Sequence, residues 1–119
     1  MPDSNAQDRK VGVTVEQMAS RLVAVEVEEA HVKRPFAARA VSRRAGIAPS
    51  AIENLLRGRI SAERISRPIE RLYVGFLKRQ IAKLETELTF VEARDPGRDV
   101  STAHAALEMA KEALSERGG

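Results

Sequence analysis

The sequence contains no cysteine and no tryptophan, and it has only one tyrosine and three phenylalanines among its 119 residues. Without cysteine the chain has no disulfide, no thiolate metal ligand and no thiol nucleophile. With so few aromatic residues, a hydrophobic core must be built mainly from alanine, valine, isoleucine and leucine, and this composition favours helices. The chain is long enough for one small domain and an appended element. No apolar run approaches the roughly 18 residues of a membrane span, and the first residues lack the apolar segment of a signal peptide, so we expect a cytoplasmic protein.

Positive charge is concentrated in one third of the chain. The formal net charge is only +3, but residues 33–71 carry ten basic side chains against three acidic ones. Nine of these ten are arginines, whose planar guanidinium binds phosphates and base edges better than a lysine does. A polyanion such as nucleic acid is therefore a natural partner, and a merely solvated basic surface is the alternative.

The N-terminal part predicts a tail followed by a helix. Residues 1–12 are mostly polar and have no periodicity, which is typical of a loose tail. Thr14 and Gln17 have the spacing of a capping box, and apolar side chains then recur every three or four residues. Alternating valines within residues 23–27 would also suit a short strand, but their helix-forming neighbours favour a helix. Pro35 is expected to end this element.

Residues 36–58 predict two short helices joined by a tight turn. Gly46 stands where a helix can end in the left-handed conformation that only glycine adopts cheaply. Pro49 presets the backbone for the first turn of the second helix, and Gly58 ends that helix. The side chains expected on one side of the first helix are Phe36, Ala37, Ala40, Val41 and Ala45, and those expected to point inward from the second are Ile52, Leu55 and Leu56.

The stretch AARAVSRRAGIAPSAIENLLRG resembles the helix-turn-helix of the phage lambda repressor and Cro family. On that motif Val41 takes the inward site of the first helix, Ser42 the position that must stay small, and Gly46 the turn glycine. The remaining apolar and turn sites are matched by Ile47, Ile52, Leu55 and Gly58. The family usually has alanine at the position of Ser42, but a hydroxyl is small enough to let the helices cross. The resemblance covers about residues 14–66, with a short fourth helix at 61–66.

The resemblance implies that the second helix, about residues 49–57, lies in the major groove of DNA while the first helix crosses the backbone. The residues at the family's base-reading positions are Ala48, Pro49, Ser50, Glu53 and Asn54, with Arg57 one turn further on. Phosphates would be contacted by Arg39, Arg43, Arg44, Arg59 and Arg64. Asn54 can pair with adenine through two hydrogen bonds and is the strongest candidate for a base contact.

Two sets of these residues have an alternative role. Ser50 and Glu53 have the S-x-x-E spacing with which two side chains cap each other at a helix start, instead of reading bases. Arg43 and Arg44 are also compatible with a solvated helix face.

The C-terminal half predicts a helical hairpin. Residues 68–94 form one long helix beginning at Pro68, the turn DPGR at 95–98 reverses the chain, and Asp99 or Ser101 caps a last helix that ends near Glu116. Apolar side chains recur at the alternating three- and four-residue spacing of a coiled coil, with charged neighbours. These seams are Val74, Leu77, Ile81, Leu84, Leu88 and Val91 in the first helix and Ala103, Leu107, Ala110 and Leu114 in the second.

Such a hairpin can close on itself or pair with a second copy in a four-helix bundle. We expect a homodimer, because repressors of this class commonly hold two recognition helices about 34 Å apart and a single module binds weakly at cellular salt. The predicted dimer interface consists of Val74, Leu77, Ile81, Leu84, Leu88, Val91, Leu107 and Leu114.

The sequence thus predicts an all-α fold with a lambda repressor-like domain at 13–67 and a helical hairpin at 68–117. The expected function is that of a sequence-specific regulator of transcription, most simply a repressor, bound to double-stranded DNA as a homodimer. The alternative is a protein-interaction module, adaptor or antitoxin-like, whose hairpin binds another protein. No residue cluster suggests an enzyme or a cofactor, and His31 and His104 lack the spacing of metal ligands.

Overall fold

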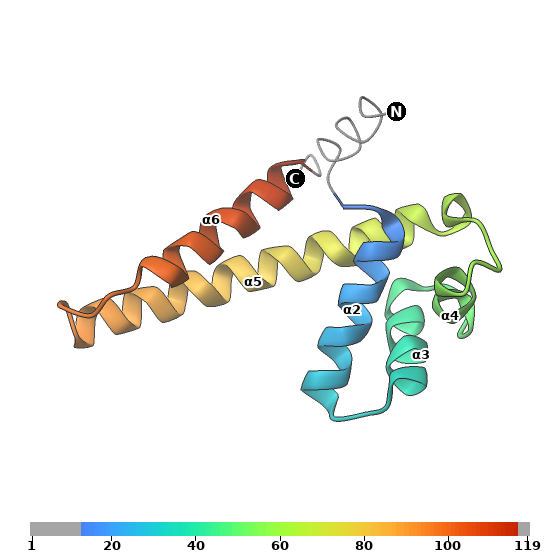
Figure 1. Ribbon diagram of the computed structural model, residues 1–119, viewed down its shortest axis with the longest axis horizontal. Coiled ribbons are helices and arrows are strands. Elements are labelled where there is room, and N and C mark those ends of the chain that lie inside the picture. Colours follow the sequence, from blue (N-terminus) through green and yellow to red (C-terminus); the bar gives the residue numbers. More distant parts are fainter. Residues whose placement is uncertain (1–12, 117–119) are drawn as a thin grey trace. The chain divides into compact units, whose positions relative to one another are not determined.

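The computed structural model describes residues 13–116, and the predicted tail at 1–12 lies outside this range. The described chain is helical and contains no strand (Figure 1), which confirms the all-α prediction. Its elements are the α-helices α2 (Val15–Ala30), α3 (Arg34–Ala45), α4 (Ala51–Leu56), α5 (Ser66–Arg94) and α6 (Ser101–Glu116), with a 3-10 helix η1 (Ala62–Arg64) before α5. None of these helices combines the length and the apolar character needed to cross a membrane.

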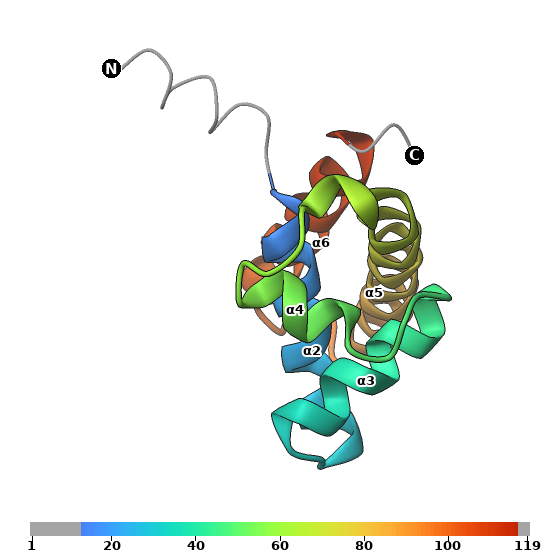
Figure 2. The ribbon, with the colours of Figure 1, turned by 90° about the vertical axis from the view of Figure 1, so that its right-hand side faces the viewer.

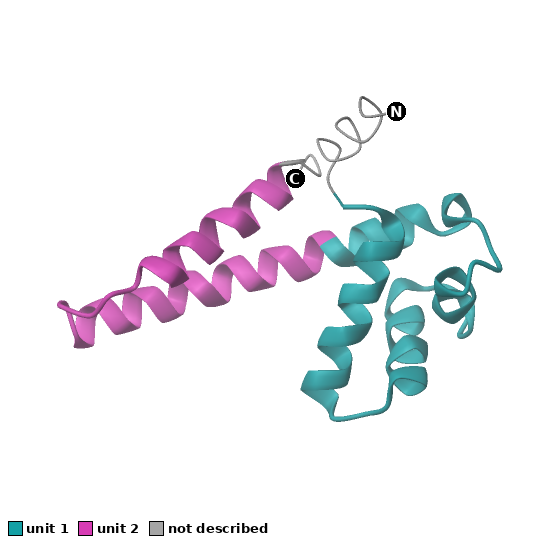
Figure 3. Cartoon of the chain, viewed as in Figure 1, with its two compact units in different colours: residues 1–73 teal, residues 74–119 magenta. Residues whose placement is uncertain are grey.

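The chain divides into two compact units between Tyr73 and Val74, inside α5 (Figure 3). Unit 1 contains α2, α3, α4, η1 and the start of α5, and unit 2 contains the rest of α5 and α6. Ile69 and Tyr73 are both buried. The first two turns of α5 therefore contribute to the core of unit 1. The boundary between the two units lies after residue 73, whereas the predicted hairpin begins at residue 68.

Helix α2 begins as the sequence predicts. The Gln17 amide donates to Thr14 Oγ1 at 3.1 Å, and the Thr14 amide donates to Gln17 Oε1 at 2.9 Å, which completes the capping box. The alternating valines of residues 23–27 are helical and not extended. The role predicted for Pro35 is wrong: α2 ends at Ala30, and Pro35 lies in the first turn of α3, where a missing N–H leaves no hydrogen bond unmade.

Glycines with a positive φ follow both α3 and α4, at the positions that the sequence predicts. Gly46 adopts φ 75°, and its amide donates to the Arg43 carbonyl at 3.0 Å, so α3 ends in a left-handed cap. Gly58 has φ 74° just after α4. The second helix is shorter than the predicted range 49–57. It begins at Ala51, because Pro49 lies in a turn that the Ala51 amide closes onto the Ala48 carbonyl at 2.9 Å.

The core of unit 1 lies among α2, α3, α4 and the first turns of α5. Helix α2 packs against α3, and α4 contacts both (Figure 2). Its largest fully buried apolar side chains are Met18, Val23, Val41, Ile52 and Ile69. Phe36 was expected on the inward side of α3 but is 60% exposed, because the inward face is set by Ala37 and Val41, four residues apart.

Ser42 joins α3 to α4 through its hydroxyl. The side chain is completely buried, and Ser42 Oγ accepts a hydrogen bond from the Ile52 amide at 3.3 Å. Ile52 is in the first turn of α4, whose amides have no partner within the helix. Ser50 occupies the N-cap position but makes no side-chain cap bond, so mutual capping by Ser50 and Glu53 does not occur. The cap of α4 thus comes from the preceding helix.

We expect Ser42→Ala to lower the free energy of unfolding by about 0.5–2 kcal/mol, the range measured for the loss of a helix N-cap side chain. Ser50→Ala, the matched control, removes a hydroxyl that caps nothing and should leave stability unchanged within ~0.5 kcal/mol. Urea denaturation followed by circular dichroism measures both variants. Equal stability of the two variants would show that the Ser42 hydroxyl does not cap α4.

Unit 2 is a helical hairpin, as predicted. Helix α5 extends two residues further toward the N-terminus than expected, and the Arg98 amide donates to the Asp95 carbonyl at 3.0 Å in the turn. Asp99 Oδ1 accepts from the Ser101 amide at 3.0 Å at the start of α6, and this hydrogen bond lowers the pKa of the Asp99 carboxyl. The predicted cap by Asp99 is confirmed, and α6 extends to Glu116, the last residue that the structure describes.

The hairpin closes through apolar and ionic contacts. Leu88 and Leu107 are buried, and two polar contacts join the helices: a hydrogen bond between His104 Nε2 and Glu92 Oε2 at 3.1 Å and an ion pair between Lys111 Nζ and Glu85 Oε2 at 3.4 Å. Of the predicted dimer-interface residues, Leu77, Leu88 and Leu107 are already buried in the single chain. The others are half-buried: Val74, Ile81, Leu84, Val91 and Leu114.

Candidate nucleic-acid interface

Helix α4 and the turn before it present a polar side to solvent. The inward side chains Ile52 and Leu55 are buried, three residues apart on one face of the helix. The predicted base-reading residues lie on the other side: Ala48, Pro49, Ser50 and Arg57 are exposed, and Glu53 and Asn54 are half-buried. The described part of the chain therefore leaves this side of α4 accessible to a ligand.

The side chains of this surface have few internal partners. No side-chain hydrogen bond of Asn54 occurs within residues 13–116, although its backbone carbonyl accepts from the Arg59 amide at 2.8 Å. Glu53 and Arg57 are one turn apart, yet neither forms an ion pair with another described residue. The backbone is thus fixed while the polar groups of Asn54, Glu53 and Arg57 stay available for an external partner.

A groove of about 310 Å³ lies beside this surface, between the start of α3 and the end of α4. Its lining residues are Arg34, Pro35, Ala38, Glu53, Leu56 and Arg57. Sequence reasoning did not predict a role for Arg34, which here lies near Arg57 although 23 positions separate them in the sequence. Arg34 stands directly before Pro35 at the start of a helix, and this placement was the sequence signal that could have suggested a role for Arg34.

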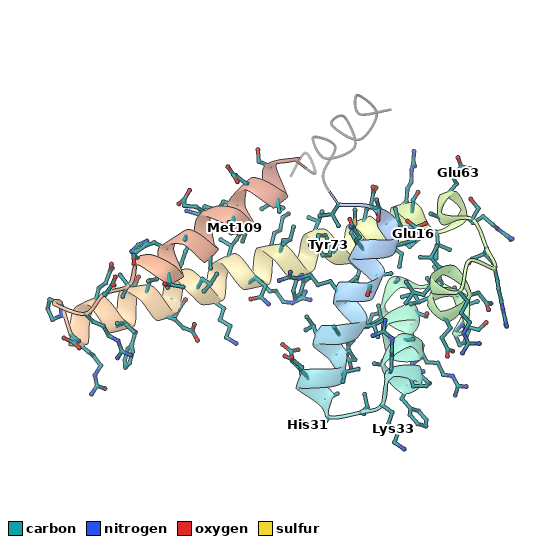
Figure 4. All side chains as sticks on the ribbon, viewed as in Figure 1. Glu16, His31, Lys33, Glu63, Tyr73 and Met109 are labelled. Atoms are coloured by element: carbon teal, nitrogen blue, oxygen red, sulfur yellow. The ribbon has the colours of Figure 1, made fainter. Side chains whose placement is uncertain are left out.

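The predicted phosphate-contacting arginines are all exposed: Arg39, Arg43, Arg44, Arg59 and Arg64. In Figure 4 side chains with nitrogen-bearing ends project outward from α3, α4 and the segment that follows. Four of the five form no ion pair within the described residues, and Arg44 is the exception. These four guanidinium groups are available to an anionic partner without breaking an internal contact.

Arg44 is bound to a carboxylate of α2. Its guanidinium makes two contacts with Glu26, one from Nη1 to Oε1 and one from Nη2 to Oε2 at 3.2 Å. The Glu26 side chain is only 10% exposed and the Arg44 side chain is 58% exposed. The hydrogen bond to Glu26 raises the pKa of Arg44, helped by the charges of Glu26 and Glu29 and opposed by partial burial. Sequence reasoning missed this pair, because its members are 18 residues apart on different helices.

We expect substitutions of the two partners of this ion pair to lower the free energy of unfolding by different amounts. Arg44→Met leaves the buried Glu26 carboxylate without a partner and should lower the free energy of unfolding by about 1.5–3 kcal/mol. Glu26→Gln keeps a neutral hydrogen-bonding group at the buried position and leaves the exposed guanidinium solvated, so its effect should stay below about 1 kcal/mol. Chemical denaturation near neutral pH compares the two variants. A larger loss for Glu26→Gln would contradict this assignment.

Comparison with known proteins gives no match: no family model, no curated protein and no solved structure corresponds to this chain. Within residues 13–116, no group of three or more histidine, aspartate or glutamate side chains is placed to hold a metal ion. The functional interpretation therefore depends on the geometry and charge of the α3, α4 surface.

Proposed function

We propose that the protein is a sequence-specific DNA-binding regulator of transcription that places α4 in the major groove. The proposal depends mainly on one observation: the side of α4 that carries Asn54 and Arg57 is accessible and has exposed arginines around it. In a lambda repressor-like arrangement, α3 and α4 are the two helices of the helix-turn-helix, with Gly46 in the turn between them.

The chemistry of the surface supports a division of roles. Asn54 can donate to and accept from the edge of an adenine, and Arg57 can bind a guanine or a phosphate. Glu53 can accept from a cytosine amino group, and Pro49 or Ala48 can contact a thymine methyl group. The arginines at 39, 43, 59 and 64 bind phosphates and fix the register of α4 on the duplex. Arg44 holds Glu26 and contributes to the same positive field.

In this proposal the regulator acts as a homodimer and represses by occupying a promoter. A module with a handful of phosphate contacts binds weakly at cellular salt, and two copies on successive major grooves raise the affinity by acting together. Unit 2 supplies the dimer contact through apolar side chains that the hairpin leaves half-buried.

The proposal is tested by the salt dependence of binding to a random-sequence duplex. If these four phosphate-binding arginines each displace a counterion, the logarithm of the association constant falls against the logarithm of salt concentration with a slope of about −3.6. Affinity should then drop on the order of 10²–10³-fold between about 50 and 200 mM salt. Fluorescence anisotropy of a labelled duplex measures this slope.

The control is Arg59→Gln, which should reduce the magnitude of the slope by about one and weaken binding to all sequences alike. Absence of duplex binding at about 50 mM salt would contradict the proposal and favour the alternative, a protein-interaction module whose hairpin binds another protein.

A further inference from the structure

The side chain of Glu53 places a negative charge on the surface that is proposed to bind DNA. Glu53 is the only acidic residue in the stretch 30–62, which contains seven basic residues. A carboxylate repels the phosphates of DNA, so it lowers the affinity for any duplex unless it accepts a hydrogen bond from the DNA in return. DNA bound at α4 should therefore present a hydrogen-bond donor to Glu53.

No contact within the described chain accounts for this charge. Ser50 makes no side-chain cap bond, so Glu53 does not complete a capping box with it. Arg57 is one helical turn away, yet Glu53 forms no ion pair with it or with any other described residue. A negative charge in the first turn also favours a helix through the helix dipole, but this effect is small for the six residues of α4.

The groove beside α4 brings Glu53 together with two arginines. Glu53 and Arg57 border the groove from α4, and Arg34 borders it from the start of α3. The two guanidinium groups offset the single carboxylate, which leaves the groove with a net positive charge and lets Glu53 come close to DNA. Because Glu53 and Arg57 border the same space from one helix, one turn apart, they can reach neighbouring atoms of one bound molecule.

A base pair of guanine and cytosine (G·C) presents the groups that suit these two side chains. In the major groove, guanine offers two acceptors, a ring nitrogen and the keto oxygen, and the amino group of cytosine lies beside that oxygen. Arg57 can donate to both acceptors of guanine, and Glu53 can accept from the amino group of cytosine. A carboxylate cannot donate, so Glu53 rejects a base that presents an acceptor at this place.

We infer that Glu53 and Arg57 together read one G·C base pair, and that Arg34 offsets the charge of Glu53 across the groove. The inference rests on the proposed DNA-binding function and deepens it by naming a base pair of the site. It also gives the carboxylate a second effect, because Glu53 weakens binding to every sequence that offers no amino group at this place. Glu53 is thus a specificity-determining residue that lowers non-specific affinity.

The inference predicts an order of preference among the four base pairs at this position. Reversal to C·G, or replacement by A·T, sets an amino group against Arg57 and an acceptor against Glu53. T·A keeps one acceptor for Arg57 and one amino group for Glu53, and it lacks only the second acceptor. We expect G·C to bind best and T·A second, with C·G and A·T at least about fivefold weaker than G·C.

The test compares Glu53→Gln with Glu63→Gln, a matched control. Both substitutions remove one negative charge and keep the size of the side chain, but Glu63 is exposed in η1 and does not border the groove. Selection from random duplex DNA should show that only Glu53→Gln reduces the preference for G·C over C·G, by about fivefold or more. Fluorescence anisotropy should show that Glu53→Gln binds a random-sequence duplex about two- to fivefold more tightly at low salt.

Two arginine variants separate the remaining roles. Arg57→Gln should weaken the same G·C preference, because it removes the contact with guanine. Arg34→Gln should weaken binding to all sequences by one factor and keep the base preference, because it removes a positive charge but no base contact. Uniform weakening by Arg57→Gln, or a changed base preference in Arg34→Gln, would overturn the inference.

Three results for Glu53→Gln would also overturn the inference. They are an unchanged base preference, a change that Glu63→Gln reproduces, and a lower affinity for random-sequence duplex. Far-ultraviolet circular dichroism verifies the helix content of each variant. Loss of helix in Glu53→Gln would show that the carboxylate is needed to fold α4, which contradicts a role in reading bases alone.

The result is separable from the proposed function. If the unmodified protein binds duplex DNA with the expected salt slope and enriches a defined site, but Glu53→Gln enriches the same site, the inference is wrong and the proposed function survives. If the unmodified protein binds no duplex at about 50 mM salt, the proposed function itself is wrong.

Discussion

Ile52→Ala should lower the free energy of unfolding by about 2–5 kcal/mol, a large part of the total stability of a small domain. Ile52 is fully buried in the core of unit 1, on the inward side of α4. Truncation removes its buried methyl and methylene groups and leaves a cavity that neighbouring helices fill only partly. Thermal and urea denaturation followed by circular dichroism measure the loss.

The control for this prediction is Phe36→Ala, which removes a larger side chain from a position that is 60% exposed. Because Phe36 loses little water-accessible apolar surface on folding, the change should stay within about 0.5 kcal/mol. A loss of 2 kcal/mol or more for Phe36→Ala, or no loss for Ile52→Ala, would mean that the inward side of unit 1 is assigned wrongly.

Asn54→Ala should abolish discrimination at one base pair of the DNA site. A two-hydrogen-bond contact between asparagine and adenine contributes about 1–3 kcal/mol of preference over the wrong base, which corresponds to about 5- to 150-fold in affinity. The side chain has no hydrogen bond to another described residue, so its removal should not change stability by more than ~0.5 kcal/mol. Competition binding with duplexes that differ at single positions measures the preference.

A contrasting variant is Arg39→Gln, which should weaken binding to matched and mismatched duplexes by the same factor. Uniform weakening by Asn54→Ala, with every base preference kept, would instead assign Asn54 to the backbone contacts. An unchanged affinity for all duplexes would remove Asn54 from the interface.

Local signals in the sequence predicted the helices and their ends well. The Thr14 and Gln17 capping box, the left-handed Gly46 and the DPGR turn each depend on a few neighbouring residues. The two prolines show the limit of such signals. Proline suits both the residues after a helix and the first turn of the next one, so neither Pro35 nor Pro49 fixed a boundary by itself.

Contacts between helices were less predictable. Arg44 and Glu26 meet because α2 and α3 pack side by side, and no periodicity within either helix indicates that pair. The small size of Ser42 was expected from the resemblance, but its bond to the Ile52 amide depends on how α3 and α4 cross. The hairpin seam was visible in the sequence as a heptad pattern. Only the contacts of Glu92 with His104 and of Glu85 with Lys111 show which residues of α5 and α6 face each other.

Selection of binding sites from random duplex DNA by the purified protein tests the central claim most directly. The account predicts enrichment of an inverted repeat whose half-site centres are about one helical turn, 10–10.5 base pairs, apart, with loss of one preferred base in each half-site when Asn54→Ala is used. A pool that remains random after selection at low salt would contradict sequence-specific recognition by α4.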